Sequence, residues 1–168
     1  MTDKHQHLFR KYKEDRSFCF GPTMPDYCLG VPESERSKRV LLDADLCVID
    51  KVHFFIRGCL DIPIIGGPDL FRWLVWVSLS EKNFNRAVDL WERSGREDEP
   101  PYFGWLNTII PLYPDTLNLK THVHTRPVGE RPYIELEPNE HPLAIEQRQG
   151  ITLSRAQNLA NHVIQEWS

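Results

Sequence analysis

The sequence predicts an α+β fold, in which helices pack on a mainly antiparallel sheet of about five to six strands. Three observations predict it. Short runs of β-branched and aromatic residues lie between clusters of turn residues. One amphipathic helix pattern lies in mid-chain and a second closes the chain. The 168 residues, of which 40% are hydrophobic, suffice for one core.

The chain is predicted to comprise an irregular N-terminal arm, residues 1–38, and a single α+β domain, residues 39–168. The arm contains Gly and Pro at irregular intervals without a sustained period, which is typical of loops. Because proline is favoured in the first turn of a helix, a short helix is expected from Pro32 to Arg39.

The first half of the domain is predicted to be β-structure. Leu46–Ile49 and His53–Leu60 are rich in β-branched and aromatic residues and predict a hairpin that turns near Asp50–Lys51. Phe71–Ser80 is the next strand. It carries apolar residues at both odd and even positions, so we expect a central strand covered on both faces.

Two longer amphipathic helices are expected. Ser80 is a plausible N-cap for the first, Gly95 fits its C-terminal cap, and one apolar stripe follows it: Phe84, Ala87, Val88 and Trp91. Residues 100–114 are aromatic and irregular, and we expect a short helical turn around Trp105. The C-terminal helix carries apolar residues at helical spacing from Leu153 to Trp167, and it begins at Ser154 or at Thr152.

Charge and apolar content restrict the partners. Twenty Lys and Arg against 24 Asp and Glu give a net charge of −4, so a broad phosphate-binding surface for nucleic acid is not expected. The segment Met1–Arg16 lacks the apolar stretch of a secretory signal, and the longest dense apolar run, Trp73–Val77, is too short to cross a bilayer. We therefore expect a cytoplasmic protein without a membrane partner.

The four cysteines are expected to be reduced thiols. None belongs to a C-x-x-C pair. A tight turn in the first hairpin would place Cys47 and Cys59 on opposite faces, and a three-residue turn would leave them four positions out of register. Neither arrangement satisfies disulfide geometry.

Leu117–Thr125 and Tyr133–Glu137 predict a second hairpin with one apolar and one polar face. Side chains alternate along a strand, so every second residue of both segments points away from the core. These outward residues combine an ammonium group, two imidazoles and two carboxylates: Lys120, His122, His124, Glu135 and Glu137.

Two registers are possible for this hairpin. A two-residue turn at Gly129–Glu130 places His124 opposite Glu135 and His122 opposite Glu137. A slip of two residues would instead place His122 opposite Glu135. Both registers leave the charged and imidazole side chains on one face.

This polar face supports three interpretations. His122 and His124 could hold one divalent metal with a glutamate as an oxygen ligand, although no cofactor is predicted. Alternatively, Glu135 could orient His124 as a general base while Lys120 binds an anion. In the third, the face is simply solvated, and its cross-strand pairs contribute about 0.2–1 kcal/mol each.

Three further residues are candidates. His141 precedes Pro142 and either caps a short helix or serves as a base or ligand. Arg57 lies within an apolar strand and pairs with Asp61, Asp45 or Glu137, or else binds an anionic ligand. Trp105 is the one tryptophan outside core-type spacing, so we count it among the ligand-binding candidates.

Seven segments together resemble a bacterial family known only as domain of unknown function 2199. They are Asp45–Asp50, Phe54–Pro63, Trp76–Ser78, Phe103–Leu106, Tyr113–Lys120, Arg131–Pro138 and His141–Ile151. The resemblance spans roughly residues 30–165 and implies no activity. Many members carry an N-terminal C-x-x-C…H metal knuckle, which Cys19 and Cys28 do not reproduce.

The family-like segments coincide with the polar face, since they include the Lys120 strand, His124, Glu135, Glu137 and His141, although not His122. Our preferred hypothesis is a cytoplasmic binding domain, monomeric or homodimeric, that uses this face to hold a partner protein or a small anionic ligand. The alternative is a small metal-dependent or acid–base enzyme of hydrolase type that uses His124, Glu135 and Lys120. An enzyme requires a pocket where these groups converge, whereas a binding domain requires an exposed patch with an aromatic anchor.

Overall fold

The computed structural model describes residues 9–11, as backbone only, and residues 18–167, with side chains through Gln165. The strands are β1 (Phe9–Lys11), β2 (Cys19–Pro22), β3 (Val40–Leu42), β4 (Leu46–Ile49), β5 (His53–Pro63), β6 (Leu70–Leu79), β7 (Tyr102–Leu106), β8 (Lys120–His124) and β9 (Tyr133–Leu136). The α-helices are α1 (Arg36–Arg39), α2 (Glu81–Asp89), α3 (Pro142–Gln149) and α4 (Leu153–Trp167). Short 3-10 helices are η2 (Asp26–Gly30), η3 (Glu33–Glu35) and η4 (Arg96–Asp98).

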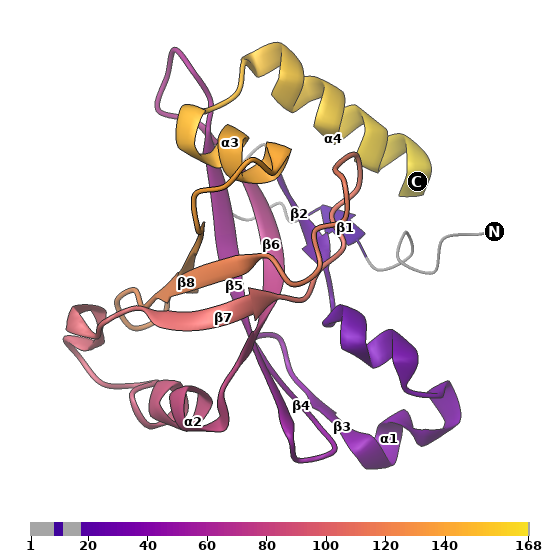
Figure 1. Cartoon of the computed structure of the whole chain (residues 1–168), viewed down its shortest axis with the longest axis vertical. Coiled ribbons are helices and arrows are strands. Elements are labelled where there is room, and N and C mark those ends of the chain that lie inside the picture. The colour runs from indigo at the N-terminus through magenta and orange to yellow at the C-terminus, as the bar shows by residue number, and fades with distance from the viewer. Residues whose placement is uncertain (1–8, 12–17, 168) are drawn as a thin grey trace.

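The strands form one sheet in the order β1-β2-β6-β7-β8-β9-β5-β4-β3. An additional pairing of β5 with β6 closes β5, β6, β7, β8 and β9 into a five-stranded barrel. The closing contact between β5 and β9 is a single parallel pair, Cys59 with Tyr133. Figure 1 shows α2 beyond one end of the barrel, and α3 and α4 beyond the other.

The predicted α+β class is confirmed, but the mainly antiparallel sheet of about five to six strands is not simply antiparallel, since it closes into a five-stranded barrel of mixed strands. Within the described residues the sheet has nine strands, closes on itself, and contains two parallel pairings, β2 with β6 and β5 with β9. Both parallel pairings join segments that are far apart in the chain. Local residue patterns indicate pairings between strands that follow one another in the sequence, but they contain no information about such long-range pairings.

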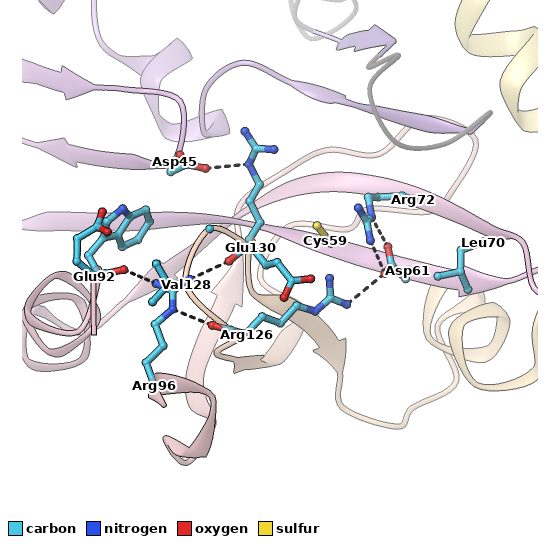
Figure 2. A pocket seen from close by; sticks show the side chains of 13 residues that line it. Asp45, Cys59, Asp61, Leu70, Arg72, Glu92, Arg96, Arg126, Val128 and Glu130 are labelled. Carbon is cyan, nitrogen blue, oxygen red and sulfur yellow. Dashed lines mark hydrogen bonds and ion pairs between the residues drawn. The ribbon is translucent and has the colours of Figure 1, made fainter. Parts of the chain in front are cut away.

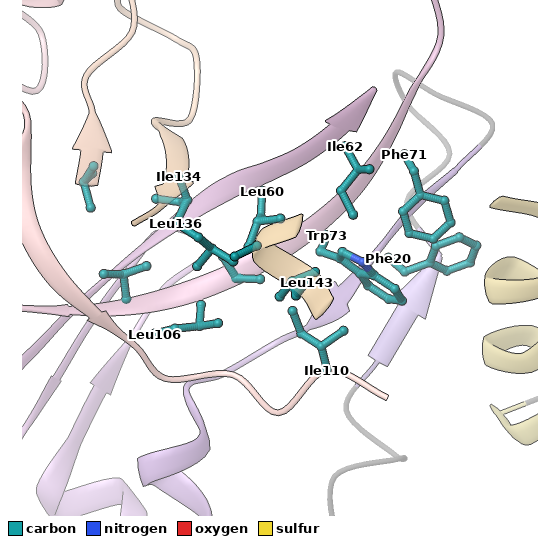
Figure 3. Packing of buried hydrophobic residues seen from close by; sticks show 14 of the residues in the cluster. Phe20, Leu60, Ile62, Phe71, Trp73, Leu106, Ile110, Ile134, Leu136 and Leu143 are labelled. Atoms are coloured by element: carbon teal, nitrogen blue, oxygen red, sulfur yellow. The ribbon is translucent and has the colours of Figure 1, made fainter. Parts of the chain in front are cut away.

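The barrel interior is the main hydrophobic core. Alternate residues of β5 and β6 point inward, and the ends are covered by apolar side chains of the helices, among them Phe84 from α2 and Leu143 from α3. In α4 four residues of the predicted stripe are buried, whereas Leu153 and Ile164 are exposed by 51% and 41%, and the side chain of Trp167 lies outside the described residues. Figure 3 shows the largest inward side chains, including Phe20, Leu60, Ile62, Phe71, Trp73, Leu106, Ile134 and Leu136.

The first predicted hairpin is confirmed as β4 and β5. Cys47 lies opposite Phe55, so the connection is the three-residue turn and Cys59 lies four positions beyond the register of Cys47. Asp50 and Lys51 adopt φ of 53° and 60°, as a tight turn requires. All four cysteines are free and buried.

The helical turn predicted around Trp105 is wrong, because residues 102–106 form strand β7. Burial alternates strictly along it, and Tyr102 and Leu106 point into the core. Gly104 explains the close approach of β7 to β6, since a Cβ there would lie 2.4 Å from a Val77 methyl carbon and 2.7 Å from the Ser78 carbonyl oxygen.

The N-terminal segment contributes to the sheet and covers part of its outer surface. Where irregular structure is predicted, β2 pairs in parallel with β6 and places Phe20 in the core. Residues 24–31 pack on the outward side chain of Trp76. The short helix predicted from Pro32 to Arg39 is found as η3 followed by α1. The division of the chain at residue 38 stays a prediction.

The helix after β6 begins where predicted but ends earlier. The Ser80 hydroxyl caps α2 by accepting from the amide of Asn83 at 3.1 Å. The helix ends at Asp89, and Gly95, with φ of 85°, begins η4 instead of capping α2. Among the helices within residues 18–167, none combines the length and apolar character that a membrane crossing requires.

Candidate functional site

The second predicted hairpin is confirmed as β8 and β9, in the slipped register. His122 lies opposite Glu135, and His124 lies opposite Tyr133. Thr121 and Val123 point into the core together with the apolar residues of β9, as the alternation predicted. The side chains on the other face of both strands are therefore free to meet solvent or a partner.

The turn of this hairpin differs from the predicted one. The strands are joined by the loop of residues 125–132, in which the amide of Glu130 donates to the carbonyl of Pro127 at 3.0 Å. Gly129 adopts φ of 92°, so the tight turn is centred on Val128–Gly129 and not on Gly129–Glu130. The shift of the turn's centre by one residue accounts for the slip of two residues in register.

Each histidine nevertheless meets the glutamate that the unslipped register assigned to it. Nε2 of His122 lies 3.1 Å from a carboxylate oxygen of Glu137, and Nε2 of His124 lies 3.3 Å from one of Glu135. The side chains reach diagonally across the ladder, as long side chains of neighbouring strands do. All four are at least one-third exposed, so the two pairs are open to solvent.

Strand β7 adds two aromatic side chains to this polar face. Phe103 lies opposite His122 and Trp105 opposite Lys120. The two aromatic rings meet edge to face, with centroids 5.0 Å apart, and Phe103 also meets the His122 ring at 6.3 Å. Their exposed fractions are 39% and 43%. We define the β7–β9 face as Phe103, Trp105, Lys120, His122, His124, Glu135 and Glu137.

Phe103 is the residue of this face that sequence patterns missed. The alternation Tyr102-Phe103-Gly104-Trp105-Leu106 carries the signal of a half-buried strand. The prediction of a helical turn at this segment excluded Phe103 from the face, because Phe103 and Trp105 do not share a face in a turn. As a strand, β7 points both rings to the same side.

His141 and Arg57 lie away from the β7–β9 face. His141 caps α3: its Nδ1 accepts from the amide of Leu143 at 3.1 Å, and its Nε2 lies 3.1 Å from the carbonyl oxygen of Asp115. Arg57 is buried beneath the N-terminal segment, donates to the carbonyl of Pro22 at 2.8 Å and stacks on Trp76.

The geometry of the face bears on its chemistry. The pocket of about 820 Å³ that the structure contains draws none of its lining from the β7–β9 face. Among the residues whose placement is described, no three His, Cys, Asp or Glu side chains are grouped so that they could hold a metal ion. The β7–β9 face thus offers an exposed surface with an aromatic pair at one side and His–Glu pairs at the other.

Comparison with known proteins places the chain in a family. No curated protein and no solved structure matches it. A family model described as an uncharacterised protein conserved in bacteria, DUF2199, matches residues 9–151. This range includes every residue of the β7–β9 face and His141, so the resemblance predicted from the seven segments is confirmed. The chain belongs to the DUF2199 family of uncharacterised proteins conserved in bacteria.

Proposed function

We propose that the protein is a binding domain that docks a partner protein on the β7–β9 face. The observation that carries this proposal is the exposed edge-to-face pair of Phe103 and Trp105. Both rings are held on a strand whose alternate residues are locked in the core, so they are presented rigidly. Docking a rigid side chain costs little conformational entropy.

The surroundings of the aromatic pair match those of protein interfaces. Aromatic residues supply most of the binding energy of an interface, and a polar rim around them excludes water. Lys120 and His122 lie directly opposite the two rings on β8, and the glutamates of β9 follow. The aromatic pair would occupy an apolar pocket of the partner, and the polar residues would form the rim.

Charge indicates the kind of partner. With neutral imidazoles the β7–β9 face carries one ammonium group and two carboxylates, and the whole chain has a net charge of −4. Complementary potentials speed association and suppress wrong partners. We therefore propose a protein whose apolar pocket is flanked by Arg or Lys side chains that face Glu135 and Glu137.

The enzyme hypothesis receives less support from the geometry. General acid–base catalysis needs substrate held within hydrogen-bond reach of the base, in a site that encloses it. His124 instead lies on an outward strand face with 39% of its side chain exposed. An exposed face with an aromatic anchor favours recognition of another protein surface.

Site-specific photo-crosslinking in living bacterial cells tests the proposal. A photoreactive phenylalanine analogue replaces Trp105 in one strain and Ile164 of α4, which is 41% exposed, in a control strain. We expect one discrete heterologous product from position 105 and none from position 164. Three outcomes would contradict the proposal: the same series of many crosslinked products from both positions, no crosslinked product from position 105, or a product that joins two copies of this chain.

Two variants distinguish the contribution of the polar rim to binding from that of the aromatic pair. Glu135→Gln and Glu137→Gln together should slow association with the crosslinked partner and weaken its dependence on salt, because rim charges act mainly on the association rate. Phe103→Ala should instead speed dissociation. Surface plasmon resonance of the purified pair measures both rates, and unchanged rates in all variants would contradict the proposed face.

A further inference from the structure

A polar pocket of about 820 Å³ lies on another side of the barrel, below the loop of residues 125–132. Outward residues of β5 and β6 line its base, the segment after α2 lines one side, and the loop covers it (Figure 2). Arginine is the most frequent charged residue in its lining: Arg72, Arg96, Arg126 and Arg131.

The inner wall of this pocket carries an excess of positive charge. Its four arginines are buried or half-buried and face only two such carboxylates, Asp61 and Asp45. The remaining acids of the lining, Glu92 and Glu130, are exposed at the rim, where water and salt screen them. The interior therefore favours an anion.

One buried carboxylate is shared by two guanidinium groups. Arg72 donates to Asp61 from Nε at 2.7 Å and from Nη2 at 3.0 Å, and Arg126 reaches the same carboxylate at 3.3 Å. Asp61 is 4% exposed. Figure 2 shows Arg72 and Arg126 converging on Asp61. A guanidinium has five N–H donors, so a single contact of 3.3 Å leaves most donors of Arg126 available.

Arg131 is similarly underused. Its Nε donates to Asp45 at 2.8 Å, and its guanidinium is half-buried at the pocket wall. The Cys59 thiol at the base adds no negative charge, because burial raises its pKa above the usual value while Arg72 only partly opposes this. The Cys59 thiol therefore does not offset the positive charge of the surrounding arginines.

The loop that carries Arg126 and Arg131 is held in place by Arg96. The Arg96 guanidinium donates to the carbonyls of Arg126 at 2.8 Å, Pro127 at 3.0 Å and Glu130 at 3.0 Å. It is 8% exposed. Arg96 is therefore a positioning residue that fixes the loop, and the two loop arginines are preorganised for a ligand.

We infer that this pocket binds the phosphate group of a small organic phosphate. A phosphate monoester carries close to two negative charges at neutral pH and three acceptor oxygens, which Arg72, Arg126 and Arg131 can contact together. Arginine is well suited to phosphate because its planar donors bind two oxygens at once. The volume exceeds that of a bare oxyanion, and Leu70, Trp91 and Val128 supply apolar lining for an organic group.

Calorimetry with defined probes tests this inference on the full-length chain at low ionic strength. Phenyl phosphate is the dianionic probe, and phenyl sulfate is a monoanion of the same shape. We expect phenyl phosphate to bind about tenfold more tightly than phenyl sulfate, and its affinity to fall as pH drops through about 6, where the phosphate gains a proton. Equal affinity for the two probes, or no saturable binding of phenyl phosphate, would overturn the inference.

Two variants and a matched control locate the site. Arg126→Gln and Arg131→Gln should each weaken phenyl phosphate binding by about tenfold, because each removes a charge-assisted contact. Arg155→Gln is the control. Arg155 lies on α4, donates its Nε to a carboxylate as Arg131 does, here at 3.0 Å, and stacks on Tyr113 as Arg126 stacks on Tyr133. Circular dichroism confirms that each variant is folded. Binding that survives in both loop variants, or falls equally in the control, would overturn the proposed site.

Discussion

Two outer surfaces of the same barrel carry large aromatic side chains, and the described residues cover one of them and leave the other exposed. On β5 and β6, Phe55 and Trp76 are buried beneath residues 24–31 and packed with Cys47 and Ile49 of the neighbouring β4, with exposed fractions of 2% and 0%. On β7, Phe103 and Trp105 are exposed by 39% and 43%. The two surfaces thus share their residue types and differ in what covers them.

This difference teaches that aromatic content alone does not distinguish core from interface. Trp76 packs against Cys28 and Val31 of its cover, and next to the cover its indole N–H donates to the carbonyl of Pro22 at 3.3 Å while Arg57 stacks on its ring. On the β7–β9 face, no part of the chain that the structure describes provides such a cover for Trp105. A partner protein that docks on the β7–β9 face would bury Trp105, as the N-terminal segment buries Trp76.

The largest expected effect is the loss of Trp76. Trp76→Ala should lower the free energy of unfolding by about 3–5 kcal/mol, because it leaves a cavity beneath the N-terminal segment. Guanidinium chloride denaturation followed by circular dichroism measures it. A loss below about 1 kcal/mol would show that the N-terminal segment packs loosely and would remove the contrast between the two surfaces.

Removing the Arg96 side chain should have a smaller effect. Arg96→Met leaves loop carbonyls without their donor and should cost about 2 kcal/mol. Amide hydrogen exchange should rise in residues 126–130 and stay unchanged in the β7–β9 face. Arg93→Met, at an exposed position three residues earlier, is the matched control. Unchanged exchange in the loop would contradict the positioning role of Arg96.

Alkaline pH should destabilise the protein through Cys19, which contacts β6 on its covered side. Burial raises the pKa of the Cys19 thiol from 9.0 to about 11. Below pH 9.0 the thiol is protonated in both states and has no effect. Between 9.0 and about 11 the unfolded chain ionises while the folded protein keeps its proton, so stability falls as pH rises, by about 1–2 kcal/mol.

Denaturation at pH values on both sides of this window measures the loss. Cys19→Ala should flatten the pH dependence without abolishing folding. If the variant and the original protein lose stability in parallel between pH 9.0 and about 11, the Cys19 thiol is not responsible.

The smallest expected effect on stability is that of Trp105. Trp105→Ala should change the free energy of unfolding by no more than about 0.5 kcal/mol, since exposed side chains contribute little to folding. The same denaturation experiment compares it with Trp76→Ala. A loss of several kcal/mol would show that Trp105 is structural, and the surface comparison would fail.

Local patterns sufficed for the elements that pair with their neighbours in sequence. The first hairpin and the doubly covered strand β6 were predictable, because their residues alternate and lie between turn residues. Strand β2 and the barrel closure were not, because β2 pairs with β6 and β5 with β9 across long stretches of chain. Such pairings are stabilised by contacts between segments that are distant in the sequence. They therefore produce no periodic residue pattern in either segment.

The candidate site was predictable in part for the same reason. Alternation on β8 and β9 sufficed to group Lys120 with the histidines and glutamates. The position of Trp105 beside Lys120 depends on β7 pairing with β8, and β7 was mistaken for a turn. The arginine pocket was not predictable, because it combines β5, β6, the segment after α2 and the loop of residues 125–132.

The most direct test of partner docking is the affinity of the crosslinked partner for three purified proteins: the original chain, Trp105→Ala and Ile164→Ala. The account predicts a loss of about 2 kcal/mol or more, close to thirtyfold, for Trp105→Ala. Ile164→Ala should bind as the original does. Binding of Trp105→Ala with the original affinity would contradict the claim that the β7–β9 face is the docking surface.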